Sequence, residues 1–211
     1  MQSQVAKALL EIGAVGFTPD APITFKSGIL SPVYVDNRRL IFWPPQWKVI
    51  IEGFRQLITE QNIDADVIAG IAAGGVPHSS ALAYIMDKPS VFVRKEEKGH
   101  GMKNRVEGGD VNGRRVLLVE DLVTTGGSSL SGVQALRDQG AIIQDCIAII
   151  SYGFQEAEQA FAEASVRLHR LTTFPVVLDV ALTDGRFGSA EKTIIEDWLD
   201  DPHGWAERQG K

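Results

Sequence analysis

One stretch, residues 116–129, constrains the fold and the chemistry of this chain more than any other. It opens with the apolar run Val116–Val119, continues with Glu120 and Asp121, and then reads Leu-Val-Thr-Thr-Gly-Gly-Ser-Ser. A short, continuous apolar run predicts a strand that is buried on both faces of a parallel sheet. Apolar residues at helical spacing follow within 130–136, which predicts a helix directly after the loop.

The order strand, acidic pair, small-residue loop and helix start predicts a site for a phosphate joined to a sugar. Gly126 and Gly127 permit positive φ and a close approach of the backbone to a ligand. Backbone N–H groups and the helix dipole can bind a phosphate dianion, and Glu120 and Asp121 can accept hydrogen bonds from sugar hydroxyls. The alternative is a plain turn that binds nothing. The run is neither a Walker loop nor a GxGxxG dinucleotide motif.

Composition narrows the class of protein. The chain has 211 residues, enough for one good hydrophobic core, and 44% of them are apolar. A net charge of −6 disfavours a nucleic-acid or membrane partner. The N-terminal residues lack signal-peptide features, and no apolar run reaches membrane-spanning length. The lone Cys146 lies in an apolar run, which predicts an inert buried thiol. We therefore expect a cytoplasmic protein.

Strand and helix patterns alternate along most of the chain. We expect helices over 2–13, 44–61, 76–86, 127–139 and 155–164, and strands over 66–72, 90–94, 115–120, 142–150 and 166–171. An irregular hairpin is expected over 22–41 and a polar loop over 95–110. This alternation predicts a single α/β domain with a mainly parallel sheet and helices on both faces. Ligands of such sheets bind beyond the C-terminal ends of the strands.

A second candidate element is the basic segment 94–105. It concentrates five cationic side chains and His100 in an acidic protein. Most charge runs are solvated surface loops, and that is the alternative here. Glycines flank His100 on both sides, and the segment directly follows an expected strand. We therefore expect a lid that closes over a pyrophosphate group and excludes water.

Two weaker elements complete the set. Residues 70–76 form a second small-residue turn after a strand, where the backbone of Ala73 and Gly74 can approach a phosphate. Residues 25–38 contain a Ser-Gly and a Ser-Pro step, and an ordinary hairpin is the alternative. The remaining histidines and the C-terminal tryptophans are expected to be structural (His78, His169, His203, Trp198 and Trp205).

Taken together, these elements resemble the type I phosphoribosyltransferases, and among them the orotate phosphoribosyltransferases. The resemblance rests on Ser-Gly…Ser-Pro…Tyr near residue 30, Arg-Lys-x-x-Lys-x-His, and Glu-Asp…Thr-Gly-Gly-Ser, and it covers roughly residues 10–165. It implies the type I phosphoribosyltransferase fold, with a core over roughly 41–165. A small hood would come from roughly 1–40 plus part of the C-terminal region. It also implies a homodimer in which the 94–105 loop reaches the neighbouring active site.

The resemblance further implies an activity. The 5-phosphoribosyl group of PRPP would pass to orotate, giving orotidine 5′-monophosphate and pyrophosphate, as in pyrimidine (UMP) biosynthesis. Mg²⁺ would be the cofactor, held mainly by substrate oxygens and not directly by protein ligands. One alternative is transfer to another base, a purine or uracil. Another is a non-catalytic PRPP-sensing regulator, which would need a DNA-binding extension and a basic surface.

Roles for individual residues also follow from the resemblance. Catalysis would involve Lys98, His100 and Asp121. PRPP would be bound by Lys26, Ala73, Gly74, Arg94, Lys95, Lys98, His100, Glu120, Asp121, Leu122, Val123, Thr124, Thr125, Gly126, Gly127 and Ser128. Orotate would be bound by Thr124, Tyr34 and Arg38. Arg38 is the candidate for the orotate carboxylate, because residues 151–154 read Ser-Tyr-Gly-Phe where one branch of the family has an arginine. Residues 172–211 contain no recognisable motif.

Overall fold

The core of the protein is a largely parallel sheet. The computed structural model describes residues 1–95 and 104–210, and among them six strands form the sheet in the order β10-β9-β8-β5-β6-β7. The strands are β5 (Val67–Ile71), β6 (Ser90–Val93), β7 (Val106–Glu107), β8 (Val116–Val123), β9 (Asp145–Ser151) and β10 (Arg167–Thr173). Only the edge pairing of β6 with β7 is antiparallel within the described sheet. The expected α/β class is confirmed.

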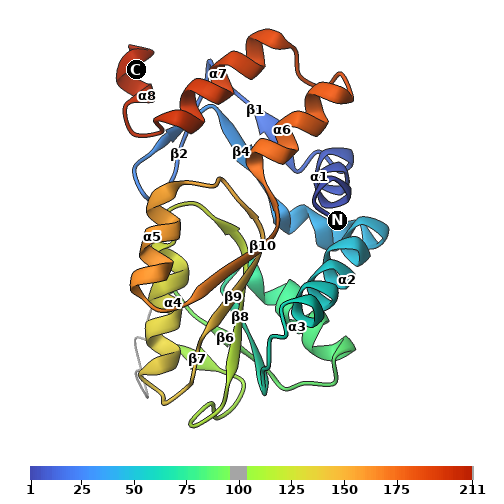
Figure 1. Ribbon diagram of the computed structural model, residues 1–211, viewed down its shortest axis with the longest axis vertical. Coiled ribbons are helices and arrows are strands. Elements are labelled where there is room, and N and C mark those ends of the chain that lie inside the picture. The colour runs from blue at the N-terminus through green and yellow to red at the C-terminus, as the bar shows by residue number, and fades with distance from the viewer. Residues whose placement is uncertain (96–103, 211) are drawn as a thin grey trace.

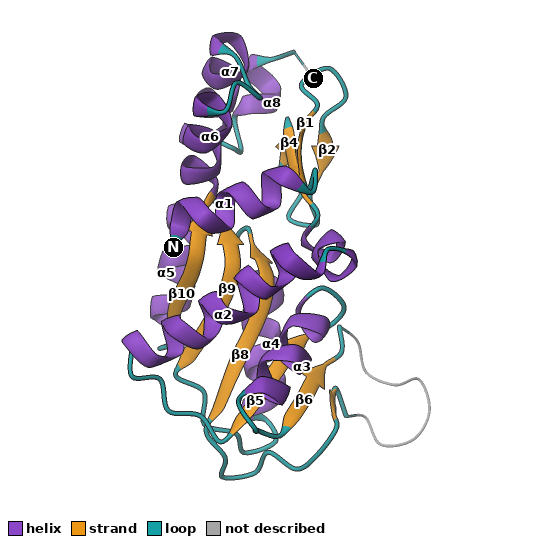
Figure 2. Ribbon diagram, turned by 90° about the vertical axis from the view of Figure 1, so that its right-hand side faces the viewer, coloured by secondary structure: helices purple, strands orange, loops and turns teal. Residues whose placement is uncertain are grey.

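Helices cover both faces of this sheet (Figures 1 and 2). On one side lie α1 (Gln2–Glu11), α2 (Pro44–Glu60) and α3 (Gly75–Ile85), and on the other lie α4 (Gly127–Arg137) and α5 (Gln155–Glu163). Strand β9 shows how the sequence produces two buried faces, because successive side chains point to opposite sides. Ile147 and Ile149 join the cluster under α1 and α2, whereas Cys146 and Ala148 join the cluster under α4 and α5.

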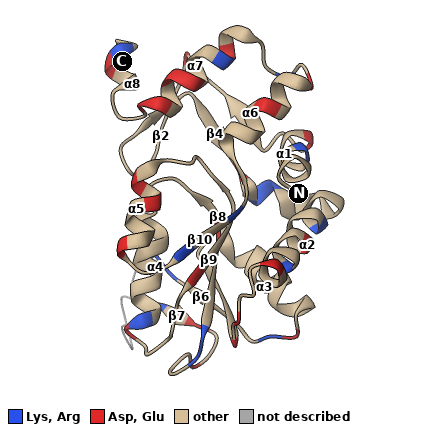
Figure 3. Ribbon diagram, in the orientation of Figure 1, with Lys and Arg blue, Asp and Glu red and all other residues tan. Residues whose placement is uncertain are grey.

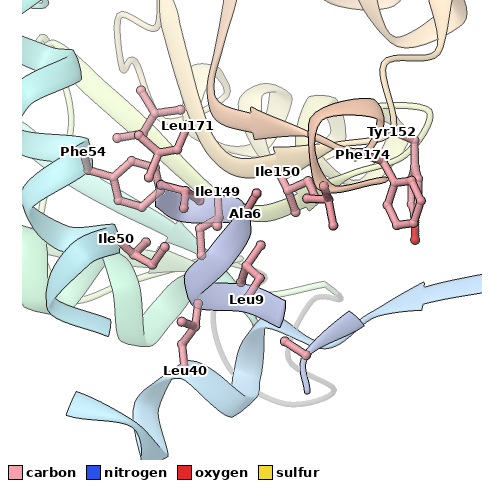
Figure 4. Close-up of a cluster of buried hydrophobic side chains, with 14 of the residues drawn as sticks. Ala6, Leu9, Leu40, Ile50, Phe54, Ile149, Ile150, Tyr152, Leu171 and Phe174 are labelled. Atoms are coloured by element: carbon pink, nitrogen blue, oxygen red, sulfur yellow. The ribbon is translucent and has the colours of Figure 1, made fainter. Parts of the chain in front are cut away.

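The first of these clusters ties the ends of the chain to the sheet. Leu9 of α1, Phe54 of α2 and Ile149 of β9 meet in its centre (Figure 4). Each of these side chains is fully buried, which stabilises the fold by roughly 1.5–3 kcal/mol per side chain relative to exposure.

Beyond the C-terminal ends of the strands lies a smaller group of elements (Figure 1). It contains two short antiparallel pairs, β1 (Val15–Phe17) with β4 (Val33–Val35) and β2 (Ile23–Thr24) with β3 (Leu30–Ser31), and the helices α6 (Phe174–Thr183), α7 (Ser189–Asp200) and α8 (Trp205–Arg208). The 3₁₀ helix η1 (Asn37–Phe42) leads from β4 to α2. These segments are the ones from which the sequence predicts a hood.

Residues 174–208, which contain no recognisable sequence motif, include the three helices α6, α7 and α8. Trp198 of α7 and Trp205 of α8 are buried, as expected for packing residues. Trp198 Nε1 donates a hydrogen bond to the Leu30 carbonyl at 3.0 Å, which joins α7 to β3. None of the helices in the described part of the chain is long and apolar enough to cross a membrane.

Two differences from the expected boundaries concern the site. Strand β8 runs to Val123, so the acidic pair lies inside the strand and not at its end. The cause is register, because Glu120, Leu122 and Val123 stay aligned with Ala148, Ile150 and Ser151 of β9. In addition, β7 occupies part of the expected 95–110 loop, where Val106 pairs with Val93.

Candidate functional site

The Thr124–Ser128 loop, which the sequence predicts to bind a phosphate and which we call the phosphate loop, lies where β8 ends and α4 begins. Gly126 holds φ at +86°, a left-handed conformation that glycine adopts without steric cost, and it immediately precedes α4. A Cβ added at Gly127 would meet no atom within 4 Å, so this residue faces open space. The N–H groups and the positive end of the α4 dipole are thus available to an anion.

A cavity of about 500 Å³ opens in front of this loop. The loop, the end of β8 and the first two turns of α4 form one wall, and the β2–β3 connection, the end of β5 and residues that follow β6 or precede β7 contribute the rest. Its lining residues are Phe25, Lys26, Ser27, Ile71, Arg94, Lys95, Arg105, Leu122, Val123, Thr124, Thr125, Gly126, Gly127, Ser128, Ser129 and Ser131. Four of the lining residues are cationic, Lys26, Arg94, Lys95 and Arg105, and they give an acidic protein a local basic surface. Acidic residues lie on outer helices such as α5 and α7 (Figure 3).

A second hollow of about 240 Å³ adjoins the first and shares four of its lining residues, Lys26, Ile71, Lys95 and Ser128. Its other walls are Val35, Asp36, Arg38, Ala72, Ala73, Gly74, Glu120 and Asp121. The shared residues make the two hollows one continuous site. It has a phosphate loop at one end and two carboxylates at the other, so a phosphorylated sugar fits along it.

The acidic pair lies in an unusual environment. Burial raises the pKa of Glu120 well above its usual range, and the neighbouring Asp121 charge adds to this while Lys95 opposes it. Burial also raises the pKa of Asp121, although backbone N–H groups and Arg38 act in the opposite sense. Glu120 Oε2 is buried and has no hydrogen-bond partner within the described part of the chain. Since buried polar atoms are normally paired, a ligand hydroxyl is a fitting partner.

The small-residue turn after β5 packs directly against this pair. A Cβ at Gly74 would overlap the Asp121 carboxylate, and one at Gly75 would lie 2.5 Å from the Val119 carbonyl oxygen. The close approach of the turn to β8 therefore requires both glycines. The peptide bond between Ala72 and Ala73 is cis.

The three residues expected to bind orotate do not all line the site. Thr124 lines the larger cavity and Arg38 lines the smaller one. Arg38 is exposed, and its Nε donates to Asp36 Oδ1 at 2.6 Å. Tyr34 lines neither hollow, because its ring lies over Gly16 of the paired strand while the next residue, Val35, faces the smaller hollow. Binding of orotate by Tyr34 stays a prediction that this position does not support.

The basic segment is described only in part. Arg94 and Lys95 line the larger cavity, and Arg94 Nη1 lies 3.5 Å from Glu107 Oε1. Lys98 and His100 lie outside the described residues, so their catalytic and PRPP-binding roles stay predictions.

Sequence reasoning missed several residues of the site. Phe25, Ser27, Asp36 and Arg105 line it. Asn37 is buried, and its Nδ2 donates to the Asp121 carbonyl at 2.7 Å. All five lie inside the 25–38 and 94–105 segments, and that was the available signal.

Comparison with known proteins agrees with this geometry. Residues 43–166 match the model of the phosphoribosyl transferase domain. The chain is 41% identical over 203 residues to an orotate phosphoribosyltransferase of Coxiella burnetii, covering 96% of this chain and 97% of that one.

Solved structures show the same similarity. The orotate phosphoribosyltransferase of Aeropyrum pernix superposes with a TM-score of 0.75 at 30% identity, covering 87% of this chain and 99% of that one. The Mycobacterium tuberculosis enzyme in complex with PRPP gives a TM-score of 0.63 at 26% identity over 83% and 97% of the two chains. The chain therefore belongs to the phosphoribosyltransferase family, and within it to the orotate phosphoribosyltransferases.

Proposed function

We propose that this site transfers the 5-phosphoribosyl group of PRPP to orotate, releasing pyrophosphate. The observation that carries the proposal is the continuity of the two hollows. They place a phosphate loop at one end and a buried carboxylate pair at the other, in a chain of the orotate phosphoribosyltransferase family.

PRPP would lie along the site with its 5′-phosphate on Thr124–Ser128 and its ribose hydroxyls on Glu120 and Asp121. Glu120, whose pKa is raised by burial, can donate as well as accept a hydrogen bond when protonated. As the bond from ribose to pyrophosphate breaks and the bond to the orotate nitrogen forms, positive charge develops on the ribose. An ionised carboxylate at Asp121 stabilises that charge in a site that is already organised.

The departing pyrophosphate would be bound by Arg94 and Lys95, with Lys98 and His100 contributing from outside the described residues. Mg²⁺ is the expected cofactor of this family. The described residues hold no cluster of three or more His, Cys, Asp or Glu side chains suited to a metal. The carboxylate oxygens of Glu120 and Asp121 in the smaller hollow nevertheless fit a hard cation that keeps mainly to substrate oxygens. When bound, it would neutralise charge on pyrophosphate.

For orotate recognition we propose Arg38 and Thr124. The Ser-Tyr-Gly-Phe segment offers no cation, and Phe154 is held by its stacking on Tyr152 at 5.6 Å. Arg38 is exposed and is the arginine among the lining residues of the smaller hollow, so its guanidinium can meet the orotate carboxylate. A base without a carboxylate would not need it.

We also propose a homodimer in which residues 94–105 serve the neighbouring site. Two large apolar side chains are strongly exposed in the described part of the chain, Phe42 of η1 at 80% and Tyr84 of α3 at 88% exposure. Exposed apolar surface is one feature of association sites, and these two residues are candidates for the dimer contact. The cytoplasm is the proposed location, a reducing compartment that suits the buried free thiol of Cys146.

The test is the loss of orotate absorbance in the presence of PRPP and Mg²⁺. We expect turnover of orotate, little inhibition by uracil or hypoxanthine, and loss of turnover in Asp121→Asn. Consumption of PRPP with hypoxanthine or uracil but not orotate would establish another base as the substrate. Binding of PRPP without turnover of any base would favour a regulator.

A further inference from the structure

Arg105 lies beside the phosphate loop and has a firmly anchored guanidinium. Its Nε donates to the Arg94 carbonyl at 2.9 Å, and its Nη1 donates to the Ser131 hydroxyl at 2.9 Å and to the Ser131 carbonyl at 3.1 Å. Ser131 belongs to the second turn of α4. Arg105 lines the larger cavity together with the Thr124–Ser128 loop, but it does not line the hollow of the acidic pair. Its charge therefore lies at the phosphate-loop end of the site.

The charge of Arg105 is not neutralised by the groups that anchor it. All three acceptors are uncharged oxygens, the carbonyls of Arg94 and Ser131 and the Ser131 hydroxyl. Arg94, by contrast, lies 3.5 Å from the Glu107 carboxylate. A cation held by neutral carbonyl and hydroxyl groups keeps its full attraction for an anion. It would add to the positive end of the α4 dipole, which the same anion would meet.

The backbone that supports Arg105 is also fixed. Arg94 N donates to the Arg105 carbonyl at 2.8 Å, so the two residues are joined in both directions. Asn104 Oδ1 accepts hydrogen bonds from Val106 N at 2.8 Å and from Gln139 Nε2, which links this segment to the end of α4. Little conformational entropy would be lost on binding, because the side chain is already placed by strand and helix.

We propose that Arg105 binds the phosphate monoester seated on the Thr124–Ser128 loop, which is the 5′-phosphate of PRPP and of the nucleotide product. This assignment rests on the proposed function and deepens it by giving one end of the substrate a dedicated cation. Two other roles make different predictions. If Arg105 binds the pyrophosphate leaving group, its replacement should weaken pyrophosphate binding more than ribose 5-phosphate binding. If Arg105 only links β6 to α4, its replacement should not affect one ligand more than the other.

Calorimetric titration of the full-length protein with ribose 5-phosphate and, separately, with pyrophosphate distinguishes these roles. Arg105→Gln removes the charge and retains a hydrogen-bonding amide for Ser131. It should weaken ribose 5-phosphate binding by about tenfold or more, the scale of a lost charge-assisted hydrogen bond, and change pyrophosphate binding by less than about twofold. The matched control is Arg114→Gln, which removes the same charge from an exposed residue at the opposite end of β8 and should change neither affinity.

Arg105→Lys keeps the charge and serves if the glutamine variant fails to fold. It should retain ribose 5-phosphate affinity within a few fold of the wild type, with a similar decrease as ionic strength rises. Unchanged ribose 5-phosphate affinity in folded Arg105→Gln would overturn the proposal. An equal loss of affinity for ribose 5-phosphate and pyrophosphate would also overturn it. If the role of Arg105 is structural, Ser131→Ala should cause the same equal loss. Failure of the wild type to convert orotate would refute the proposed function instead and leave these affinities interpretable.

Discussion

The side chain of Asn37 donates a hydrogen bond to the backbone carbonyl of Asp121, with 2.7 Å between Nδ2 and the oxygen. Asn37 begins η1, and Asp121 lies in β8, 84 residues further along the chain. The bond fixes the segment that carries Asp36 and Arg38 beside the acidic pair, so it connects the two walls of the smaller hollow. A buried amide thus sets the distance between the proposed base-binding residue and the ribose-binding residues.

Replacement of Asn37 tests this connection. Asn37→Ala leaves the Asp121 carbonyl without its donor, and we expect a loss of about 1–3 kcal/mol in the free energy of unfolding together with a lower kcat/KM. Asn37→Asp is nearly isosteric but, when ionised, cannot donate, and it should be worse than alanine. Urea unfolding and steady-state kinetics measure both effects. Wild-type kcat/KM in Asn37→Asp would show that the contact does not organise the site.

Gly127 provides a graded test of the phosphate loop. A Cβ at this position meets nothing within 4 Å, so Gly127→Ala should fold normally and bind PRPP only somewhat more weakly. The larger side chain of Gly127→Val would occupy the space of the phosphate and should abolish PRPP binding in a folded protein. Calorimetry measures the affinity and circular dichroism the fold. Unchanged PRPP affinity in the valine variant would place the 5′-phosphate elsewhere.

Asp121→Asn should separate activity from stability. The substitution keeps the shape of the side chain and removes the charge that faces the developing cation, so we expect kcat to fall about 10²-fold. Because burial raises the pKa of Asp121, the folded state disfavours its charged form, and the neutral amide should not lower Tm at pH 7. A near-wild-type kcat combined with a lower Tm would instead indicate a carboxylate that only supports the turn.

The sequence predicted the sheet, its helices and both halves of the site, because apolar periodicity and small-residue turns are local signals. Contacts between distant segments left no such signal. Asn37 reads as one residue of a polar stretch, and only the fold shows its bond to Asp121. The sequence predicts that β8 ends at residue 120, because carboxylates normally end a buried strand. Pairing with β9 instead continues to Val123. The C-terminal helices lack a motif because their role is packing, as Trp198 shows.

His78 predicts how stability changes with pH. It is buried at the start of α3, where Trp47 Nε1 donates to its Nδ1 at 2.9 Å, and burial lowers its pKa from 6.5 to about 4. Between these values the unfolded chain binds the proton more readily than the folded protein, so stability falls as pH decreases from about 6.5 towards about 4. His78→Gln keeps an acceptor for Trp47 and should flatten this part of the profile, measured by urea unfolding from pH 7 to pH 4.5.

The comparison between wild type and His78→Gln is the informative quantity, because other groups titrate in the same range. Glu120 and Asp121 have raised pKa values in the fold, so their protonation favours the folded state as pH falls. These contributions are common to both proteins and cancel in the difference. A difference that stays constant from pH 7 to pH 4.5 would mean that His78 is not held neutral by the fold.

The last prediction concerns the proposed action of residues 94–105 across a dimer. Lys98→Ala and Asp121→Asn should each be nearly inactive alone, since one removes a cation from the pyrophosphate and the other a charge from the ribose end. If each site combines Asp121 of one subunit with Lys98 of the other, a heterodimer of the two variants holds one intact site and one doubly defective site. Mixing the variants under conditions of subunit exchange should therefore restore activity.

A mixture with the double variant, which carries both substitutions, is the matched control. Paired with Lys98→Ala it yields no intact site in either arrangement, so activity should stay at the level of the single variant. Exchange itself can be followed by native mass spectrometry of tagged subunits. If heterodimers form between Lys98→Ala and Asp121→Asn but turnover does not recover, each subunit uses its own residues 94–105. The exposure of Phe42 and Tyr84 would then need to be explained without a shared active site.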